Sequence, residues 1–505
     1  MKQSSSPPAQ VLRADALSFA SVLAQSITHI APAVGLVFVL QFITTMAGIA
    51  APLAFAMAFF IVLMIAVCLV QLALHLPSAG GYYTYVSRAL NPKAGFLAAW
   101  MFFLYEPPTA AVNLAFLSFM LHNIVKIEAG INCPWYVFFL TAVALITVLI
   151  YRGIEISATV VIWLTTIEIL IVACLAITSF MHPGDGRIHL QDFGSLHSFG
   201  QKGFYLAIVF SILIFTGFEA VAPLAEETRD PRRTLPRAVL LSTTLTGIFF
   251  VVCSMAILTG WGNSHIATFA DSTEAPVILL AKRLWGVAWV VVLLAVVNSI
   301  LGVAIAGNNA ATRVFFAMGR ARSLPATLDY VHPRFQTPRN AILLQTFITV
   351  AIGLGVGFWI GPDQEYYVLG VAMTLGLLFI YCAGNVGVFF YYRRERRAEF
   401  NFLLHFLLPL LSTLSLIWVA YKSAVPLPEP PVRYAPILAA TWLVAGVVVM
   451  LTVRRASGTP LLPLDSANLN SPNLIPANVP PAVASKEMDE TALRPGSQPS
   501  RQRLL

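Results

Sequence analysis

The chain carries about twelve apolar stretches, each long enough to cross the ~30 Å hydrocarbon core of a bilayer as an α-helix of about 20 residues. In lipid, every backbone N–H and C=O group has to be satisfied within the chain, and only helices and closed barrels do this. The sequence therefore predicts an all-α polytopic membrane protein with about twelve transmembrane helices. These stretches begin near Ala16, Gly48, Gly95, Pro134, Glu155, Gly203, Arg237, Trp285, Asn340, Tyr367, Phe402 and Tyr434.

Composition supports the same fold class. Of 505 residues, 58% are hydrophobic and 11% are charged, a balance that would give a soluble protein an apolar surface. We expect a cytoplasmic head over residues 1–15, a twelve-helix domain over 16–455 and a tail over 456–505. The tail is rich in Pro, Ser, Asn and Ala, and it cannot bury enough apolar surface to offset its ordering entropy. We expect it to be disordered and cytoplasmic.

The formal charge of +8 is concentrated in alternate loops, such as the one that contains Arg229, Arg232, Arg233 and Arg237. Positively charged loops stay in the cytoplasm, so this pattern predicts that both termini are cytoplasmic. Because the loops account for the basic residues, we expect the lipid bilayer as a partner and no nucleic acid.

Sequence motifs argue against catalysis. The cysteines Cys68, Cys133, Cys174, Cys253 and Cys382 are scattered and form neither a disulfide framework nor a metal motif. The chain has no phosphate-binding loop, HExxH or GxSxG motif. We therefore expect neither an enzyme nor an ATP-driven pump, and no cofactor or metal.

Two of the apolar stretches contain helix-breaking residues at membrane depth. The first reads SVLAQSITHIAPAVGLVFVLQF, and its Pro32 predicts a discontinuity near His29–Gly35 because proline lacks an N–H donor and obstructs the preceding turn. The sixth carries Gly217, Glu219 and Pro223, which predict a second break.

The two breaks lie five helices apart, and an odd number of helices inverts the orientation of the second relative to the first. Paired interruptions in corresponding spans indicate an inverted-repeat transporter with its site at the midplane. Spans one to five and six to ten would be the two repeats. The alternative is that Pro32 and Gly217 only kink packed helices, since both residue types are common in membrane helices.

Three segments resemble the amino acid-polyamine-organocation family of secondary transporters, as a bacterial-type amino acid permease. They are PSAGGYYTYVSRALNPKAGFLAAW (77–100), FTGFEAVAPLAEETRDPRRTLPRA (215–238) and NNAATRVFFAMGRARSLP (308–325). The resemblance implies a leucine-transporter-like inverted repeat with discontinuous helices one and six, and spans eleven and twelve outside it. It also implies a location in the plasma membrane, the inner membrane of a bacterium.

Broken helices suit an amino acid because their free N–H groups attract a carboxylate and their free carbonyl groups attract an ammonium. In that family, an aromatic residue after the sixth-span break commonly acts as a lid, a role open to Phe215 or Phe218. The expected substrate-binding residues are Ile30, Ala31, Pro32, Ala33, Val34, Gly35, Glu106, Phe215, Thr216, Gly217 and Phe218.

Buried carboxylates suggest the coupling chemistry. Many proton-coupled members of the family carry a lysine midway along span five, where this chain has Glu168. A carboxylate there takes up a proton or attracts a cation, which favours a proton as the coupling ion, with sodium as the alternative. Glu106, near the midplane of span three, contacts either a substrate ammonium or a cationic side chain, or it is a protonated group beside the Pro107–Pro108 kink.

Other polar residues each have a functional and a structural interpretation. Glu219 contacts substrate or holds the broken geometry, and His29 is a proton site or a packing residue. Asn308 and Asn309 join helices or line an ion site. Near the inner face, basic residues form either a gate of ion pairs with Glu226, Glu227 and Asp230 or a topology signal that contacts lipid headgroups. These gate residues are Arg229, Arg233, Arg313 and Arg320.

The leading hypothesis is secondary-active amino acid transport by alternating access. An amine or polyamine carrier is the alternative, favoured if Glu106, Glu168 and Glu219 converge on one cavity. A non-transporting amino acid sensor is a third hypothesis.

Overall fold

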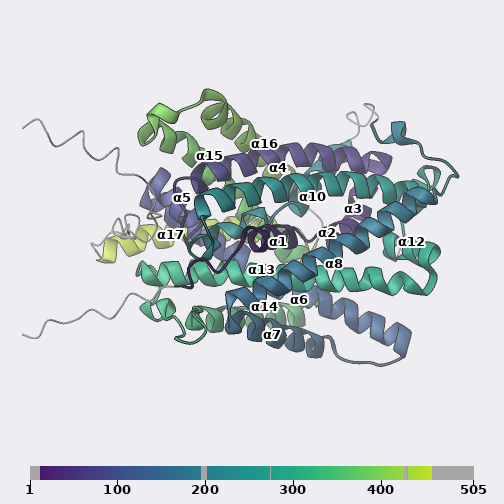
Figure 1. Ribbon diagram of the computed structural model, residues 1–505, viewed down its shortest axis with the longest axis horizontal. Coiled ribbons are helices and arrows are strands. Elements are labelled where there is room, and N and C mark those ends of the chain that lie inside the picture. The colour runs from purple at the N-terminus through teal and green to yellow at the C-terminus, as the bar shows by residue number, and fades with distance from the viewer. Residues whose placement is uncertain (1–11, 195–201, 273, 426, 428–429, 458–505) are drawn as a thin grey trace, which may run out of the picture. The chain divides into compact units, whose positions relative to one another are not determined.

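Helices make up the regular structure of the computed structural model, which describes residues 12–194, 202–272, 274–425, 427 and 430–457 (Figure 1). No β-strand occurs within these ranges, where the one isolated bridge joins Leu17 to Thr228. The predicted tail, 456–505, lies outside the described residues except for its first two positions, as does most of the predicted head.

Eleven helical stretches of the described chain are long and apolar enough to cross a membrane. The first, Phe19–Ala73, has 55 residues, or about 80 Å of helix, which is more than twice the thickness of the core. It turns at Gly48, where φ is +56°, and so contains two crossing segments. Counted separately, these give twelve segments, as the sequence predicts.

In chain order the twelve segments are α1 (Phe19–Ile30), α2 (Pro32–Val34), η1 (Gly35–Val39) and α3 (Leu40–Ala47); α4 (Ala51–Ala73); α6 (Pro92–Ala129); α7 (Trp135–Arg152); α8 (Ile154–Met181); α9 (Lys202–Ile214) and η5 (Phe218–Glu227); α10 (Pro231–Trp261); α13 (Val290–Arg320); α14 (Arg339–Ile360); α15 (Pro362–Arg394); η10 (Leu403–Leu407) and α16 (Leu408–Ala424); and α17 (Tyr434–Ser457). The shorter elements between them are η2 (Gly48–Ala50), α5 (Tyr82–Ala89), η3 (Leu190–Gly194), η6 (Asn263–His265), α11 (Ile266–Ala270), α12 (Pro276–Trp285), η7 (Gly286–Trp289), η8 (Ala326–Asp329) and η9 (Arg397–Glu399).

Local sequence explains where the helices begin and end. The Asn91 side chain accepts a hydrogen bond of 3.0 Å from the N–H of Ala94, and Pro92 occupies the first helical position, so α6 starts there. Gly130, with φ at +69°, ends the same helix in the left-handed conformation that glycine adopts most readily.

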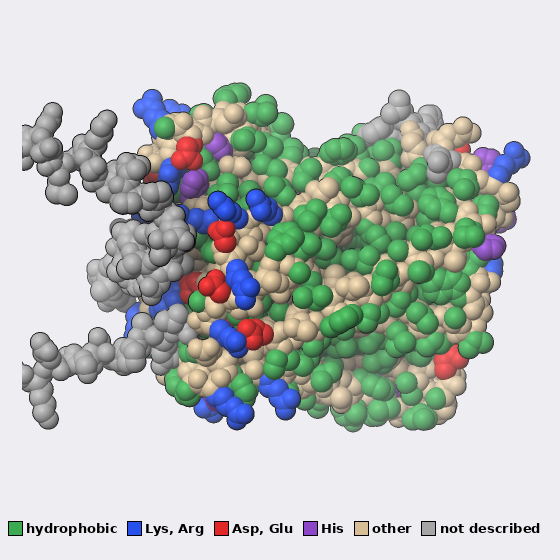
Figure 2. Space-filling view, in the orientation of Figure 1, with side chains coloured by type: hydrophobic (Ala, Val, Ile, Leu, Met, Phe, Trp, Pro, Cys, Tyr) green, Lys and Arg blue, Asp and Glu red, His purple; other side chains and the backbone are tan. Residues whose placement is uncertain are grey.

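The long helices run side by side (Figure 1). In the described structure, α1 packs against α8, α10 and α13, while α6 packs against α13 and α15. Figure 2 shows apolar side chains over the middle of the visible face and Lys and Arg gathered at the end where α5 and α17 lie. An apolar belt with charged ends is the surface that a bilayer requires.

Both predicted breaks are present. Helix α1 ends at Ile30, and Ala31 adopts the left-handed conformation (φ +57°, ψ +63°) before Pro32 starts α2. Helix α9 ends at Ile214, Gly217 has a φ of +118°, and the chain continues as the 3₁₀ helix η5. The sixth segment therefore continues as a tighter helix, with Pro223 inside it, rather than as a second α-helix.

Candidate functional site

The two breaks touch each other. A Cβ atom built on Gly217 would lie 2.8 Å from the carbonyl oxygen of His29 and would also overlap the His29 ring. Real Cβ atoms do not approach other atoms so closely, and the positive φ of Gly217 adds strain for any other residue. Glycine is therefore required where the end of α1 meets the start of η5.

Glu168 of α8 binds the backbone at the first break. Its Oε1 atom accepts hydrogen bonds from the N–H of Ala33, at 2.7 Å, and from the hydroxyl of Ser299 on α13, at 2.6 Å. Its Oε2 atom is buried and has no hydrogen-bond partner among the described residues. Through Oε1, Glu168 thus joins α8 to the first break and to α13, while Oε2 makes no hydrogen bond among the described residues.

Glu219 stabilises the second break. Its Oε2 atom accepts hydrogen bonds from the N–H of Gly217, at 3.0 Å, and from the hydroxyl of Tyr381, at 2.5 Å. Its Oε1 atom accepts one from the hydroxyl of Tyr105, at 2.8 Å. With both oxygens bonded, Glu219 ties η5 to α6 and α15, which supports the structural interpretation of this residue.

Glu106 is 1% exposed and differs from Glu219 in having an oxygen without a hydrogen-bond partner. That atom, Oε1, lies 3.7 Å from Nε2 of His29, which is too long for a hydrogen bond. The Nδ1 atom of His29 is also buried without a partner in the described structure. Buried polar atoms without a partner are uncommon in folded proteins, and a bound molecule or water usually satisfies them.

A small cavity adjoins the side chain of Glu106. Its volume of about 20 Å³ has room for about one water molecule, so the structure is closed around the site. Carboxylates of α6 and η5 line the cavity, and its lining contains no lysine or arginine. The lining residues are Gly80, Tyr82, Phe102, Tyr105, Glu106, Glu219, Ala220, Ala222, Pro223, Ala310, Val314, Leu377 and Ile380.

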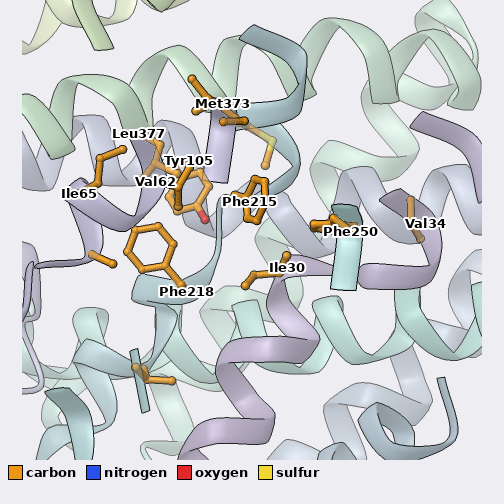
Figure 3. Packing of buried hydrophobic residues seen from close by; sticks show 14 of the residues in the cluster. Ile30, Val34, Val62, Ile65, Tyr105, Phe215, Phe218, Phe250, Met373 and Leu377 are labelled. Carbon is orange, nitrogen blue, oxygen red and sulfur yellow. The ribbon is translucent and has the colours of Figure 1, made fainter. Parts of the chain in front are cut away.

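The two candidate lid residues point in different directions. The Phe215 ring meets that of Phe250 edge-on at 5.1 Å, whereas the Phe218 ring stacks on that of Tyr381 at 5.6 Å. Figure 3 shows Tyr105 and Phe218 on one side of Phe215, and Phe250 on the other. Phe218 therefore lies with the residues that surround Glu219.

The chain matches the model of the amino acid permease family over residues 21–454. The chain belongs to this family. It is a transporter family, so the protein is not an enzyme.

Similar proteins include carriers named for different substrates. The chain is 29% identical over 321 residues to an uncharacterized transporter of Mycobacterium tuberculosis, covering 61% of this chain and 68% of that one. It is 25% identical over 311 residues to a low-affinity putrescine importer of Escherichia coli, covering 60% and 66%. It is 28% identical over 314 residues to a branched-chain amino acid permease of Bacillus subtilis, covering 58% and 64%.

Of the expected substrate-binding residues, Glu106 lines the cavity and the others do not. Gly35 instead provides a second close approach, because a Cβ atom there would lie 2.8 Å from Ile214 and 2.9 Å from Phe250. The hydroxyl of Thr216 bonds to the carbonyl of Leu213 within its own turn. Close approaches between the breaks join Gly217 to His29 and Gly35 to Ile214. Substrate binding by Ile30–Gly35 and Phe215–Phe218 stays a prediction.

Asn308 and Asn309 connect helices in the transporter. The Oδ1 atom of Asn308 accepts a hydrogen bond from Gln345 at 2.8 Å, and the same Gln345 nitrogen donates to the carbonyl of Pro107. The amide nitrogen of Asn309 donates to Ser157 at 3.3 Å, and its Oδ1 accepts from Arg313. In this structure both residues bond to neighbouring helices.

Two of the predicted gate arginines join α13 to η5. Arg313 and Glu227 form a fully buried, bidentate ion pair, with Nε and Oε2 2.8 Å apart. Arg320 and Glu226 form a second pair, at 2.6 Å, with side chains that are 30% and 19% exposed. Together the two pairs hold η5, in the sixth segment, against α13, which is the eighth segment. The sequence predicts that this part of the sixth segment faces the cytoplasm.

The other two predicted gate arginines do not cross between these helices. Arg229 donates to the backbone carbonyl of Asp15 at 2.8 Å, which fastens the N-terminal segment beside η5. Arg233 lies 3.7 Å from Asp230 in its own turn, and both side chains are exposed. An exposed pair of this kind contributes little to stability.

Sequence reasoning missed three residues that hold the carboxylates: Tyr105, Tyr381 and Ser299. Each is a polar group inside an apolar stretch, and such groups need partners in a membrane. The position of Tyr105, directly before Glu106, was a usable signal. The partners of Tyr381 and Ser299 come from helices far away in sequence, so only the fold identifies them.

Proposed function

We propose that this member of the amino acid permease family carries amino acids across the plasma membrane by alternating access, as a proton-coupled symporter. The observation that supports this most is the contact between the two broken helices, which places exchangeable backbone groups and three buried glutamates near the middle of the bundle. Charge distribution supports cytoplasmic termini, because the basic residues gather at one end of the visible face (Figure 2).

In this account, Glu106 receives a positive group of the substrate, either its ammonium or a cationic side chain. Its Oε1 atom is buried and lacks a hydrogen bond, and the residue lines the cavity. A buried carboxylate without a partner is costly, and a bound cation offsets that cost. Phe218, stacked on Tyr381, is the better placed of the two aromatics to cover a substrate.

An amine or polyamine carrier is the second candidate. Glu106 and Glu219 line one cavity without a basic residue, which suits a substrate that lacks a carboxylate. Glu168 does not line this cavity, so two of the three carboxylates converge on it rather than all three. One similar protein is named as a putrescine importer and another as a branched-chain amino acid permease, so both classes belong in the test.

The test is uptake of radiolabelled L-amino acids and putrescine into proteoliposomes in sodium-free buffer, with and without an inward proton gradient. We expect at least one amino acid to accumulate only with the gradient. Uptake of putrescine alone would replace the amino acid assignment with the amine one. Binding without any uptake would favour the sensor.

Esterification of the substrate carboxylate separates the two carriers further. If an amino acid is the substrate, its methyl ester should compete poorly for uptake, since the ester has lost the anionic group. Equal competition by the ester would support the amine carrier.

A further inference from the structure

We propose that Glu168 couples one proton to each substrate by occupying, while the substrate is absent, the backbone N–H at which the substrate carboxylate binds. This inference rests on the proposed transport of amino acids. In it, Glu168 binds the proton and gives up its place at the N–H to the substrate carboxylate.

The Ala33 N–H is free for such an exchange because of the break. In a continuous α-helix it would donate to the carbonyl of His29, four residues earlier. The left-handed conformation of Ala31 separates these groups, and the His29 carbonyl faces Gly217 instead. The Ala33 N–H donates to Glu168, so a carboxylate already binds at this point.

A carboxylate of the substrate has the same charge and geometry as the one it would replace. Two carboxylates at one N–H in a buried site repel each other strongly, because little solvent screens them. The substrate therefore binds there only if Glu168 is neutral. The Oε2 atom of Glu168 is the place for the proton, since it is buried and has no hydrogen-bond partner among the described residues.

The charges balance through the cycle. A proton from the outside bonds to Oε2 of Glu168, which becomes a neutral carboxylic acid and releases the Ala33 N–H to the substrate carboxylate. The Ala33 N–H therefore binds one negatively charged carboxylate at a time, first that of Glu168 and then that of the substrate. When the substrate leaves to the inside, Glu168 gives its proton to the cytoplasm, and its Oε1 atom binds the N–H again.

Ser299 holds the Glu168 side chain in place during this exchange. Its hydroxyl donates to Glu168 at 2.6 Å, and it can stay bonded to the neutral acid while the Ala33 N–H changes partner. Glu168 lies on α8 and Ser299 on α13, so the proton-binding group remains fixed to these two helices. In the described structure no lysine or arginine pairs with Glu168, and hence no internal cation removes the need for the proton.

Proton uptake on binding tests the proposal with the unaltered protein. Purified full-length transporter in weak buffer with a pH indicator is mixed with the amino acid that gives the greatest uptake, and separately with its methyl ester. We expect uptake of about one proton per bound amino acid and none per bound ester. The Kd of the amino acid should rise about tenfold per pH unit once Glu168 is deprotonated in the free protein.

The Glu168→Gln variant should lose this linkage, with proton uptake per bound amino acid falling from about one to about zero. Glu155→Gln is the matched control, because Glu155 lies on the same helix, α8, and is 45% exposed. If Glu168→Gln fails to fold or bind, proton uptake by the unaltered protein with the amino acid and with its ester still tests the exchange.

Equal proton uptake with amino acid and ester, or unchanged linkage in Glu168→Gln, would overturn the exchange while leaving amino acid transport standing. Binding of putrescine with no binding of any amino acid would overturn both the exchange and the proposed substrate. The two failures are therefore distinguishable.

Discussion

Single residues determine how the breaks are built. Ala31 adopts a left-handed conformation that alanine rarely takes, and it does so between the end of α1 and Pro32. The surrounding contacts have to offset a strain of about 1–3 kcal/mol. Glu168 provides one such contact through the N–H of Ala33. Strain of this kind concentrates at functional sites.

The assignment of Glu106 leads to a binding prediction. Glu106→Gln removes the charge that faces the substrate but keeps the shape of the side chain. We expect the Kd of the transported substrate to rise about 10- to 100-fold, because a charged hydrogen bond of about 1.5–3 kcal/mol is lost. Equilibrium binding of radiolabelled substrate measures this change.

Glu128→Gln is the control for that measurement. Glu128 lies at the C-terminal end of the same helix, α6, and is exposed. Its substitution should leave the Kd unchanged. An unchanged Kd in Glu106→Gln as well would remove Glu106 from the site.

The two helix breaks could be predicted at the residue level, because Pro32 and Gly217 act through local backbone rules that a sequence displays. Glu106 and Glu219 stood out as charges at membrane depth. The sequence could not show that the Ala33 N–H binds Glu168 or that Tyr381 binds Glu219. Those contacts join residues far apart in the chain and depend on how the helices pack.

At the scale of elements, ion pairs fasten η5 to α13 with different strengths. Arg313→Met leaves Glu227 as an unpaired buried charge, and we expect the free energy of unfolding to fall by about 3–5 kcal/mol. Arg320→Met breaks a partly exposed pair and should cost about 1 kcal/mol or less. Denaturant titration of the purified variants measures both.

The exposed Arg233–Asp230 pair supplies the control for this comparison, and Arg233→Met should have no measurable effect. Equal losses for Arg313→Met and Arg320→Met would show that burial of the Arg313–Glu227 pair is not what gives it strength.

A histidine two residues after the end of α4 makes stability depend on pH. His75 lies 3.3 Å from Glu399, yet burial, aided by the charge of Arg396, lowers the pKa of His75 below its ordinary value of about 6.5. The folded state therefore binds this proton more weakly than the unfolded state does. Stability contributed by neutral His75 is present above pH ~6.5 and is lost as the pH falls below it.

The pH dependence of the thermal midpoint tests this prediction. Between pH 7.5 and 5.5 the midpoint of the wild-type protein should fall by more than that of His75→Gln, which cannot take up the proton. Parallel curves for the two proteins would contradict the role of His75.

At the scale of the whole molecule, the hydropathy pattern predicted twelve segments because the bilayer sets their length. Nine of the twelve predicted starts lie within three residues of the observed ones, as where α14 begins at Arg339 rather than at Asn340. The other three differ by five or six residues: α10 begins at Pro231 rather than Arg237, α13 at Val290 rather than Trp285, and α15 at Pro362 rather than Tyr367. The 3₁₀ form of η5 was not predictable. In this region Glu219 bonds to Tyr105 and Tyr381 on two other segments, an arrangement that no local propensity encodes.

In the proposed function, the contact between the two broken helices is the transport site. Gly217→Leu would introduce a side chain against the His29 carbonyl at a backbone φ of +118° and force the breaks apart. Gly355→Leu is the matched control, because a Cβ atom at Gly355 meets no other atom within 4 Å.

The measurement is gradient-driven uptake in proteoliposomes that contain equal amounts of each inserted protein. We expect uptake at the wild-type rate for Gly355→Leu and no uptake for Gly217→Leu. Near-normal uptake by Gly217→Leu would contradict a transport site at the paired breaks.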